Sequence, residues 1–345
     1  MSNSSKKVLL SGVKPTGRPH IGNYFGAMKQ MVDLQNAHPE AEKFFMIADY
    51  HGLNFIQDAK VMHQNIIDLA LDYLAIGLDP RQSVIFKQSD VSAHTELAWI
   101  FDTITTMPYL MRAHAFKDAE AKDKEISVGT FNYPMLMAAD ILLYDATHVP
   151  VGQDQKQHIE YARDTAEKFN RVFGETLTLP EPMILKDVAI VPGTDGQKMS
   201  KSYGNTIPLF ATDEEIRKAV MSIVTDSKKA EDTVIHNQVF SGDFTQGEKV
   251  ISLYAPVNVY SIHKLFRTED ELATLYTEKA GKYKDLKEAL VTDISAFIKP
   301  LRERREALAE DLTHVLAVLK DGGSRARVKA DAKMDAVRKA IGVAL

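Results

Sequence analysis

The sequence contains no cysteine, which excludes disulfide bonds and metal sites built on thiolates. It also lacks any run of apolar residues long enough to span a membrane as a helix. The first residues, MSNSSKK, contain no apolar stretch of the kind found in secretory signals. Together these absences favour a cytoplasmic protein with no membrane partner.

The composition that remains is that of a globular protein. Of the 345 residues, 45% are hydrophobic and 26% are charged, which suits one large or two medium domains with buried cores. The formal net charge is −5, so a nucleic-acid partner would be held by a local basic patch and not by the chain as a whole.

The N-terminal part of the chain alternates between strand-like and helix-like patterns. Apolar runs of strand length occur at residues 7–12, 43–49, 83–88, 148–151 and 183–185. Segments with helical periodicity lie between them, and Asp58 is a good N-cap for one of these helices. The alternation predicts an α/β domain with a parallel sheet, whose ligands bind where strands turn into helices. From residue 206 onward strand patterns are few, and we expect a mainly helical region.

The stretch GRPHIGNY, residues 17–24, lies at the first predicted strand-to-helix turn. His20 and Asn23 are three residues apart, so both can donate hydrogen bonds from one face of the first helical turn. Gly22 permits close approach of a ligand, and the start of a helix favours phosphate. The loop matches neither the Walker A pattern nor GxGxxG. Taken alone, such a stretch more often marks a plain strand–turn–helix connection.

The stretch GTDGQKMSKSYGN, residues 193–205, is a polar loop between apolar segments. Lys198 and Lys201 can neutralise the charge that develops on a leaving pyrophosphate. A solvated surface loop is the alternative. The pentapeptide KMSKS at 198–202 is nevertheless specific, and together with HIGN upstream it indicates a nucleotide site.

Two further features carry charge. Asp140 shares a helical face with Met137, Ile141 and Tyr144, so this carboxylate needs a donor, either from a ligand or from within the protein. The segment from Ser324 onward is rich in basic residues, which more often form a solvated helix face than an RNA contact. Its basic residues are Arg325, Arg327, Lys329, Lys333, Arg338 and Lys339.

With both motifs in view, the sequence resembles the class I aminoacyl-tRNA synthetases, which carry HIGH-type and KMSKS motifs. Asn23 stands where the HIGH pattern has its last His. Residues 133–170, YPMLMAADILLYDATHVPVGQDQKQHIEYARDTAEKFN, and 219–227, AVMSIVTDS, look like the bacterial tryptophan-specific members. The resemblance covers most of residues 8–227.

The resemblance implies a Rossmann-like catalytic domain over residues 1–205 and an α-helical region over 206–345 that meets the anticodon. The last helix is a candidate to pack back on the catalytic domain. The implied reaction joins L-tryptophan to tRNA(Trp) with ATP, through tryptophanyl-adenylate. Mg²⁺ would arrive with ATP, without a dedicated protein metal site, and the family likeness implies a homodimer.

The resemblance also implies roles for individual residues. The catalytic set is His20, Asn23, Lys198 and Lys201. The ATP contacts are Lys14, Pro15, Thr16, Gly22, Asn23, Gly152, Gln153, Asp154, Ile190, Lys198, Met199, Ser200, Lys201 and Ser202. The tryptophan contacts are Asp140, on the indole N–H; Met137, Tyr133 and His51, around the ring; and Gln155, near the α-amino group. A further ATP-contacting lysine matches Lys117, Lys122 or Lys124.

Two rival functions remain open at this stage. One is another adenylate-forming enzyme, either a tyrosyl-tRNA synthetase or a small nucleotidyltransferase. The other is a paralogue without catalysis that binds RNA or regulates. The predicted helical C-terminal region argues against a small nucleotidyltransferase. The intact motif residues argue against lost catalysis, namely His20, Asn23, Lys198 and Lys201.

Overall fold

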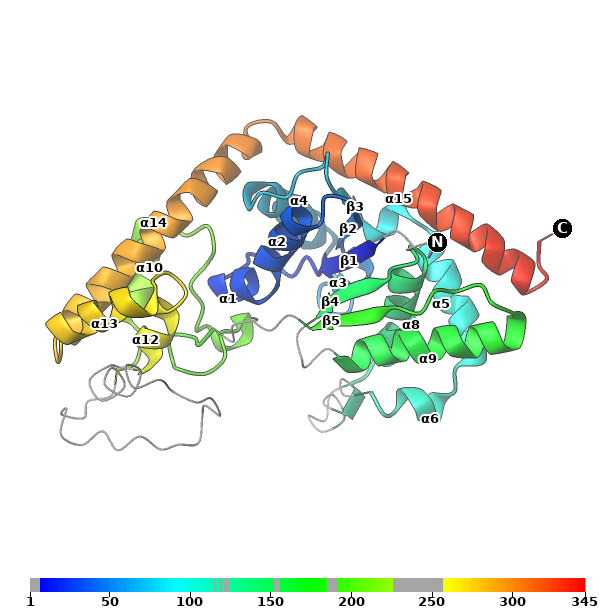
Figure 1. The fold of residues 1–345 in the computed structure, drawn as a ribbon, viewed down its shortest axis with the longest axis horizontal. Helices are drawn as coiled ribbons and strands as arrows, with labels where there is room; N and C mark the ends of the chain where they lie inside the picture. The colour runs from blue at the N-terminus through cyan, green and yellow to red at the C-terminus, as the bar shows by residue number, and fades with distance from the viewer. Residues whose placement is uncertain are drawn as a thin grey trace, which may run out of the picture. The chain divides into compact units, whose positions relative to one another are not determined.

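The computed structural model describes residues 7–113, 116–117, 120, 125–151, 156–184, 191–225 and 257–344. The chain forms two compact units. The first contains residues 1–17, 30–187 and 308–345, and the second contains residues 18–29 and 188–307. Each unit is therefore built from segments that lie far apart in the sequence, as the colours of Figure 1 show.

A five-stranded parallel sheet forms the centre of the first unit (Figure 1). In the spatial order β3-β2-β1-β4-β5, its strands are β1 (Val8–Val13), β2 (Glu42–Ile47), β3 (Val84–Lys87), β4 (His148–Val151) and β5 (Glu181–Ile184). Leu10 of β1 lies opposite Phe44 of β2, which lies opposite Val84 of β3. The predicted α/β fold with a parallel sheet is confirmed.

Helices cover both faces of this sheet. The helical elements of this unit are α2 (Lys29–Ala37), α3 (Asp49–Gly52), α4 (Ala59–Ala75), the 3₁₀ turn η2 (Gln88–Asp90), α5 (Ala93–Ile104), α6 (Met107–Leu110), α8 (Val128–Leu142), α9 (Lys156–Phe173) and α15 (Leu312–Ala340). Side chains alternate across a strand, so Val8 and Leu10 join a core with α5, α8, α9 and α15, whereas Leu9 packs with Leu34 of α2. Burial on both faces explains why these strands are continuous apolar runs.

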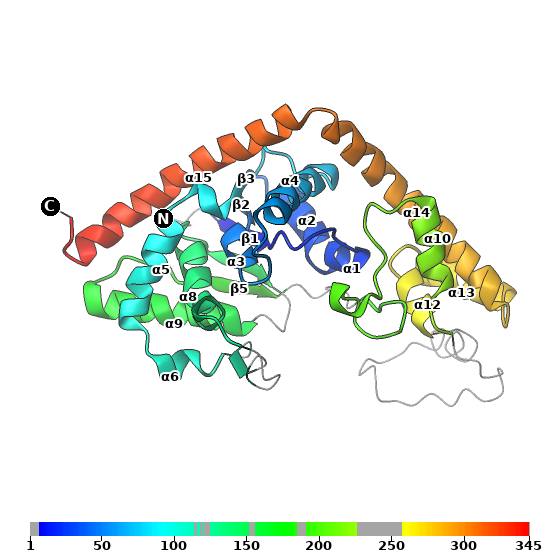
Figure 2. The same cartoon turned by 180° about the vertical axis from the view of Figure 1, so that it is seen from behind.

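The last helix of the chain, α15, packs along β3 in the first unit (Figure 2). Gly322 makes this approach possible, because a Cβ there would lie 1.8 Å from the carbonyl oxygen of Ile85. An ion pair of 2.6 Å between Arg338 and Glu96 of α5 adds a second attachment. A residue with a side chain at 322 would push the helix off the strand.

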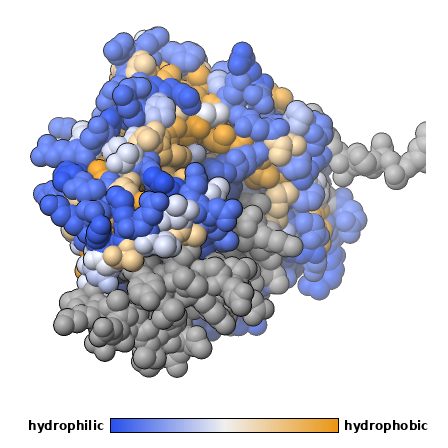
Figure 3. Space-filling model, turned by 60° about the vertical axis from the view of Figure 1, so that its left-hand side comes forward, coloured by the Kyte–Doolittle hydropathy of each residue, from blue (hydrophilic) through white to orange (hydrophobic). Residues whose placement is uncertain are grey.

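In the part of the second unit that the structure describes, the regular elements are helical. Its elements are α1 (Ile21–Asn23), the π-helical turn η1 (Tyr24–Met28), the 3₁₀ turn η4 (Lys201–Tyr203), α10 (Asp213–Met221), α12 (Val257–His263), α13 (Glu269–Glu278) and α14 (Tyr283–Ala309). Thr212 and Thr268 begin α10 and α13 with reciprocal caps to Glu215 and Glu271. The face drawn in Figure 3 is mostly hydrophilic.

An aromatic cluster fastens the helix that follows HIGN within the second unit. The ring of Phe25 lies 5.5 Å from both Phe266 and Phe297, and Tyr24 lies 5.4 Å from Phe297. Edge-to-face and offset contacts of this kind stabilise aromatic pairs by about 0.5–1.5 kcal/mol beyond burial alone. The cluster thereby fixes the position of the first turn on α14.

The strand boundaries differ from the sequence prediction mainly at the last strand. β5 begins at Glu181, two residues before the predicted Met183, and Leu185 lies outside the described residues. Pro182 is tolerated there because β5 is an edge strand, where a missing N–H breaks no ladder on the outer side. Among the described residues, no helix has the length and apolar character needed to cross a membrane.

Candidate active site

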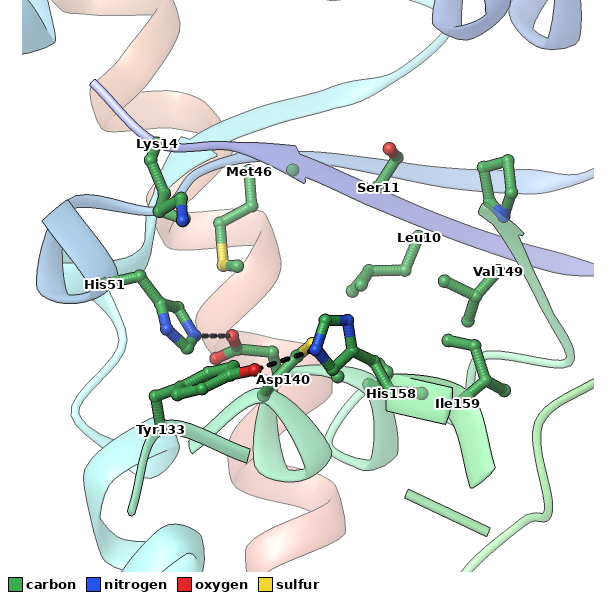
Figure 4. A pocket seen from close by; sticks show the side chains of 15 residues that line it. Leu10, Ser11, Lys14, Met46, His51, Tyr133, Asp140, Val149, His158 and Ile159 are labelled. Carbon is green, nitrogen blue, oxygen red and sulfur yellow. Dashed lines mark hydrogen bonds and ion pairs between the residues drawn. The ribbon is translucent and has the colours of Figure 1, made fainter. Parts of the chain in front are cut away.

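A pocket of about 220 Å³ lies in the first unit at the carboxyl ends of β1, β2 and β4 (Figure 4). Because β2 and β4 flank β1 on opposite sides, this is the point where the strand order reverses, which is where open parallel sheets bind ligands. The lining is mostly apolar and comprises Leu10, Ser11, Gly12, Lys14, Met46, Ala48, His51, Tyr133, Met137, Asp140, Ile141, Val149, Pro150, His158 and Ile159. Such a lining suits a large ring with few polar contacts.

Asp140, on α8, is the only carboxylate among the described residues that line this pocket, and it is 2% exposed. Its Oδ2 accepts from His51 Nε2 at 2.8 Å. Its Oδ1 accepts from His94 Nδ1 at 2.6 Å and from Gln88 Nε2 at 2.7 Å. Burial alone would raise the pKa of Asp140, but the hydrogen bonds from the two histidines outweigh it and hold this pKa well below its ordinary value.

The sequence posed two roles for Asp140, a ligand-reading carboxylate and one satisfied internally. The structure shows that Asp140 both faces the pocket and has internal donors. A carboxylate offers about four acceptor positions. Among the described residues, two donors occupy Oδ1 and one occupies Oδ2, so Oδ2 can accept one more hydrogen bond.

Three predicted ring contacts, His51, Tyr133 and Met137, lie together in the same pocket. Figure 4 shows Tyr133 beside His51, and their ring centroids are 6.3 Å apart. The Tyr133 hydroxyl bonds His158 Nε2 at 2.8 Å. Lys14 also lines the pocket; burial lowers its pKa, and its Nζ lies 4.4 Å from the centroid of the Phe55 ring.

Sequence reasoning missed three residues at this site: Gln88, His94 and His158. Gln88 and His94 are fully buried behind Asp140, and His158 shares the pocket. One signal could have identified Gln88, because this residue directly follows β3 at the edge of the sheet where ligands bind. No pattern in the sequence pointed to His94, because its partner Asp140 lies 46 residues away.

In the second unit, HIGN forms a reciprocal cap. The Asn23 backbone N–H donates to His20 Nδ1 at 3.2 Å, and Asn23 Oδ1 accepts from the His20 backbone N–H at 3.1 Å. Burial, with a smaller contribution from Lys201, lowers the pKa of His20 to about 4, so the ring is neutral near pH 7. Because Nδ1 accepts, the neutral ring carries its proton on Nε2, and this N–H and the Asn23 amide N–H groups are donors that a phosphate oxygen could accept from.

The KMSKS loop lies beside HIGN within the same unit. A Cβ on Gly22 would lie 2.9 Å from His20 Nδ1 and 3.3 Å from the Cβ of Met199, so a side chain there would displace the His20 ring. The Met199 N–H donates to the Val191 carbonyl at 2.9 Å. Asn205 shapes the loop, accepting from the Ser200 N–H at 2.8 Å and donating to the Lys198 carbonyl at 3.2 Å.

Several predicted contacts lie outside the described residues: Gly152, Gln153, Asp154, Gln155 and Ile190, with Lys122 and Lys124 among the lysine candidates. The third candidate, Lys117, is described and exposed. In the described part of the chain, no group of three or more His, Asp or Glu side chains is arranged to hold a metal ion.

The parallel sheet, the pocket at its switch point and the paired HIGN and KMSKS segments define a class I aminoacyl-tRNA synthetase. The family of class I tRNA synthetases (W and Y) matches residues 2–299, and the chain belongs to it. The tryptophan–tRNA ligase of Fusobacterium nucleatum is 45% identical, over 97% of each chain. That of Rhodopirellula baltica is 44% identical, over 97% of this chain and 99% of the relative.

Solved structures agree with this assignment. Tryptophanyl-tRNA synthetase from Campylobacter jejuni, complexed with ADP and tryptophan, has a TM-score of 0.83 and 41% identity, covering 97% of this chain and 99% of that one. The tryptophanyl-tRNA synthetase of Mycoplasma pneumoniae has a TM-score of 0.77 and 29% identity, covering 98% of each chain.

Proposed function

We propose that this protein is a tryptophan–tRNA ligase, which activates L-tryptophan with ATP and transfers it to tRNA(Trp). The observation that carries the proposal is the buried Asp140 in an otherwise largely apolar pocket. Indole has one donor, its N–H, and no strong acceptor, so a carboxylate with an acceptor position left is its natural partner. Relatives that match the chain over nearly its full length are tryptophan–tRNA ligases.

In the proposed first step the tryptophan carboxylate attacks the α-phosphorus of ATP in line, and the bond to the bridging oxygen breaks. Pyrophosphate leaves with that electron pair, and tryptophanyl-adenylate remains. In the second step a hydroxyl of the terminal ribose of tRNA attacks the acyl carbon, and AMP leaves. The attacking carboxylate is already ionised, so the protein acts by positioning and charge stabilisation.

For ATP, we propose contacts from Lys14, Pro15, Thr16 and residues 152–154, with Ile190 against the adenine. The proposed ATP contacts also include His20, Gly22, Asn23 and residues 198–202. Neutral donors from His20 and Asn23 suit phosphate oxygens, and Lys198 and Lys201 suit the leaving pyrophosphate. Mg²⁺ accompanies the ATP phosphates in this scheme.

For tryptophan, we propose that Asp140 accepts the indole N–H while Met137, Tyr133 and His51 surround the ring. Gln155 holds the α-amino end. The support for this set is that its four described members line one pocket.

The remaining assignments concern tRNA and assembly. We propose that residues 1–205 carry catalysis and residues 206–345 meet the anticodon, in a protein that works in the cytoplasm. We also propose a homodimer. Its support is a set of large apolar side chains left exposed on α5, on α6 and directly after it, and at the start of α8, namely Trp99, Met107, Met111 and Val128.

Pyrophosphate–ATP exchange with each of the twenty amino acids tests the function. We expect exchange that depends on tryptophan and Mg²⁺ and needs no tRNA. Exchange driven by tyrosine would instead identify tyrosine as the substrate, since the matching family includes both specificities. Absence of exchange with every amino acid would instead favour the paralogue without catalysis.

A further inference from the structure

A hydrogen-bonded chain lies behind the pocket carboxylate. The Tyr144 hydroxyl lies 2.9 Å from His94 Nε2, and His94 Nδ1 lies 2.6 Å from Asp140 Oδ1. Tyr144 and His94 are fully buried, and neither lines the pocket. They therefore reach a ligand only through Asp140.

The direction of donation along this chain follows from chemistry. An ionised carboxylate only accepts, so His94 donates from Nδ1, and Nε2 of the same ring is the atom that can accept. Burial raises the pKa of Tyr144 well above its ordinary value, so the hydroxyl stays protonated and donates to that nitrogen. Every proton in the chain points toward Asp140.

We propose that His94 and Tyr144 are positioning residues that set the preference for tryptophan. With Gln88, His94 occupies both acceptor positions of Oδ1 and fixes the plane of the carboxylate, so that the remaining position on Oδ2 faces the pocket. The Tyr144 hydroxyl in turn fixes the tautomer and orientation of the His94 ring. This inference rests on the proposed function, since it concerns how the same pocket reads the indole N–H.

The donors around Asp140 are suited to this task because none is an arginine or lysine in the described part of the chain. A guanidinium would bind both oxygens and neutralise them. Three single-point donors instead hold the carboxylate in place and leave one acceptor position on a charged group. The rings of His94 and Tyr144 also pack against Phe86, so removing a hydroxyl alone keeps the packing.

Tyr144→Phe tests the proposal with two amino acids of nearly equal shape. One is tryptophan, and the other is benzothienylalanine, in which sulfur replaces the indole N–H. We expect kcat/KM for tryptophan in pyrophosphate exchange to fall about twofold to tenfold, the range for one neutral hydrogen bond, mainly through KM. The value for benzothienylalanine should not change, since that ring donates nothing to Asp140.

Two controls separate positioning from general damage. Tyr276→Phe removes an equivalent buried hydroxyl, 3.1 Å from His263 in the second unit. This variant should leave kcat/KM unchanged for both amino acids. His94→Asn can still donate to Oδ1 without the link to Tyr144, so it should retain more selectivity than His94→Phe. A melting curve for each variant accompanies the kinetics.

The outcomes are distinct. A loss confined to tryptophan supports the positioning role. An equal loss with both amino acids, or no loss with either, overturns it while leaving the ligase function standing. If the unaltered protein shows no tryptophan-dependent exchange, the proposed function fails, and the positioning role fails with it.

Discussion

Each unit of this protein contains a hydrogen-bonded chain of the same three residue types. In the first, Tyr144 bonds His94, which bonds Asp140. In the second, Tyr276 bonds His263 at 3.1 Å, and His263 bonds Asp293 at 2.9 Å.

The two chains differ in what else the carboxylate meets. Arg267 engages both oxygens of Asp293, with its Nη2 2.9 Å from Oδ1, so the charge is neutralised within the protein. Asp140 receives only histidine and glutamine donors among the described residues, and it faces a pocket. The same residue types thus hold α12, α13 and α14 together in one unit, whereas in the other they place a carboxylate where a ligand can bind. The remaining charge and the adjoining pocket separate the two roles.

The largest expected effect concerns the second unit, whose chemistry should lie in the KMSKS loop and not in its Tyr–His–Asp chain. Lys198→Ala and Lys201→Ala should each slow adenylate formation by roughly 3 kcal/mol of transition-state stabilisation, with tryptophan binding little changed. Single-turnover rates and tryptophan affinity measure the two effects. Near-normal rates would make the loop a solvated surface. Lys218→Ala, an exposed lysine on α10, is the control.

The next effect contrasts the two carboxylates directly. Asp140→Ala should reduce the ratio of kcat/KM for tryptophan over phenylalanine by the value of one charged hydrogen bond, about 1.5–3 kcal/mol. Asp293→Ala should lower the melting temperature and leave the ratio alone. If Asp140→Ala keeps the wild-type ratio, Asp140 does not read the indole.

Asp140→Asn sharpens the same contrast. From the sequence alone, an amide that can still accept predicts a smaller loss than alanine. The structure predicts that the amide also destabilises the fold. Three donors already point at this group, and the amide nitrogen must face one of them. We therefore expect Asp140→Asn to lower the melting temperature as well as selectivity. A melting curve equal to wild type would contradict this.

A smaller effect concerns pH and the second chain. Burial lowers the pKa of His263 from 6.5 to about 4. Below pH 6.5 the unfolded chain therefore binds a proton that the folded protein refuses, and stability falls as pH drops toward 4. We expect this group to contribute a loss of about 1–2 kcal/mol at pH 5. Melting temperatures at pH 7 and 5 should differ less in His263→Gln. If the melting temperature falls equally between pH 7 and 5 in wild type and variant, His263 is not the cause of the pH dependence.

The smallest effect concerns the basic residues of α15. Arg325, Arg327 and Lys329 bond the Pro80 carbonyl, the Asp90 carbonyl and Glu42, all within the first unit. Replacing all three with glutamine should lower the melting temperature slightly, since exposed pairs contribute about 0–1 kcal/mol each. Lys320→Gln is the matched control. A raised KM for tRNA at unchanged stability would instead support the RNA-contact role that their charge suggested.

The α/β alternation, Asp58 as the N-cap of α4 and both nucleotide motifs could be predicted from the sequence because each depends on neighbours within a few residues. The start of β5 could not, because whether Pro182 costs the sheet a ladder hydrogen bond depends on the strand order. The need for glycine at position 322 could not be predicted either, because it arises from the close approach of the β3 backbone.

Residue type and local spacing fix what His20, Lys198 and Asp140 can donate or accept, so these groups could be identified before the fold was known. Which groups meet Asp140, and how many acceptor positions it keeps, depends on the folded chain. His94 and Gln88 reach Asp140 across separations of 46 and 52 residues, and Arg267 reaches Asp293 across 26. The availability of a buried charge depends on such partners, because desolvation makes each added donor or cation decisive.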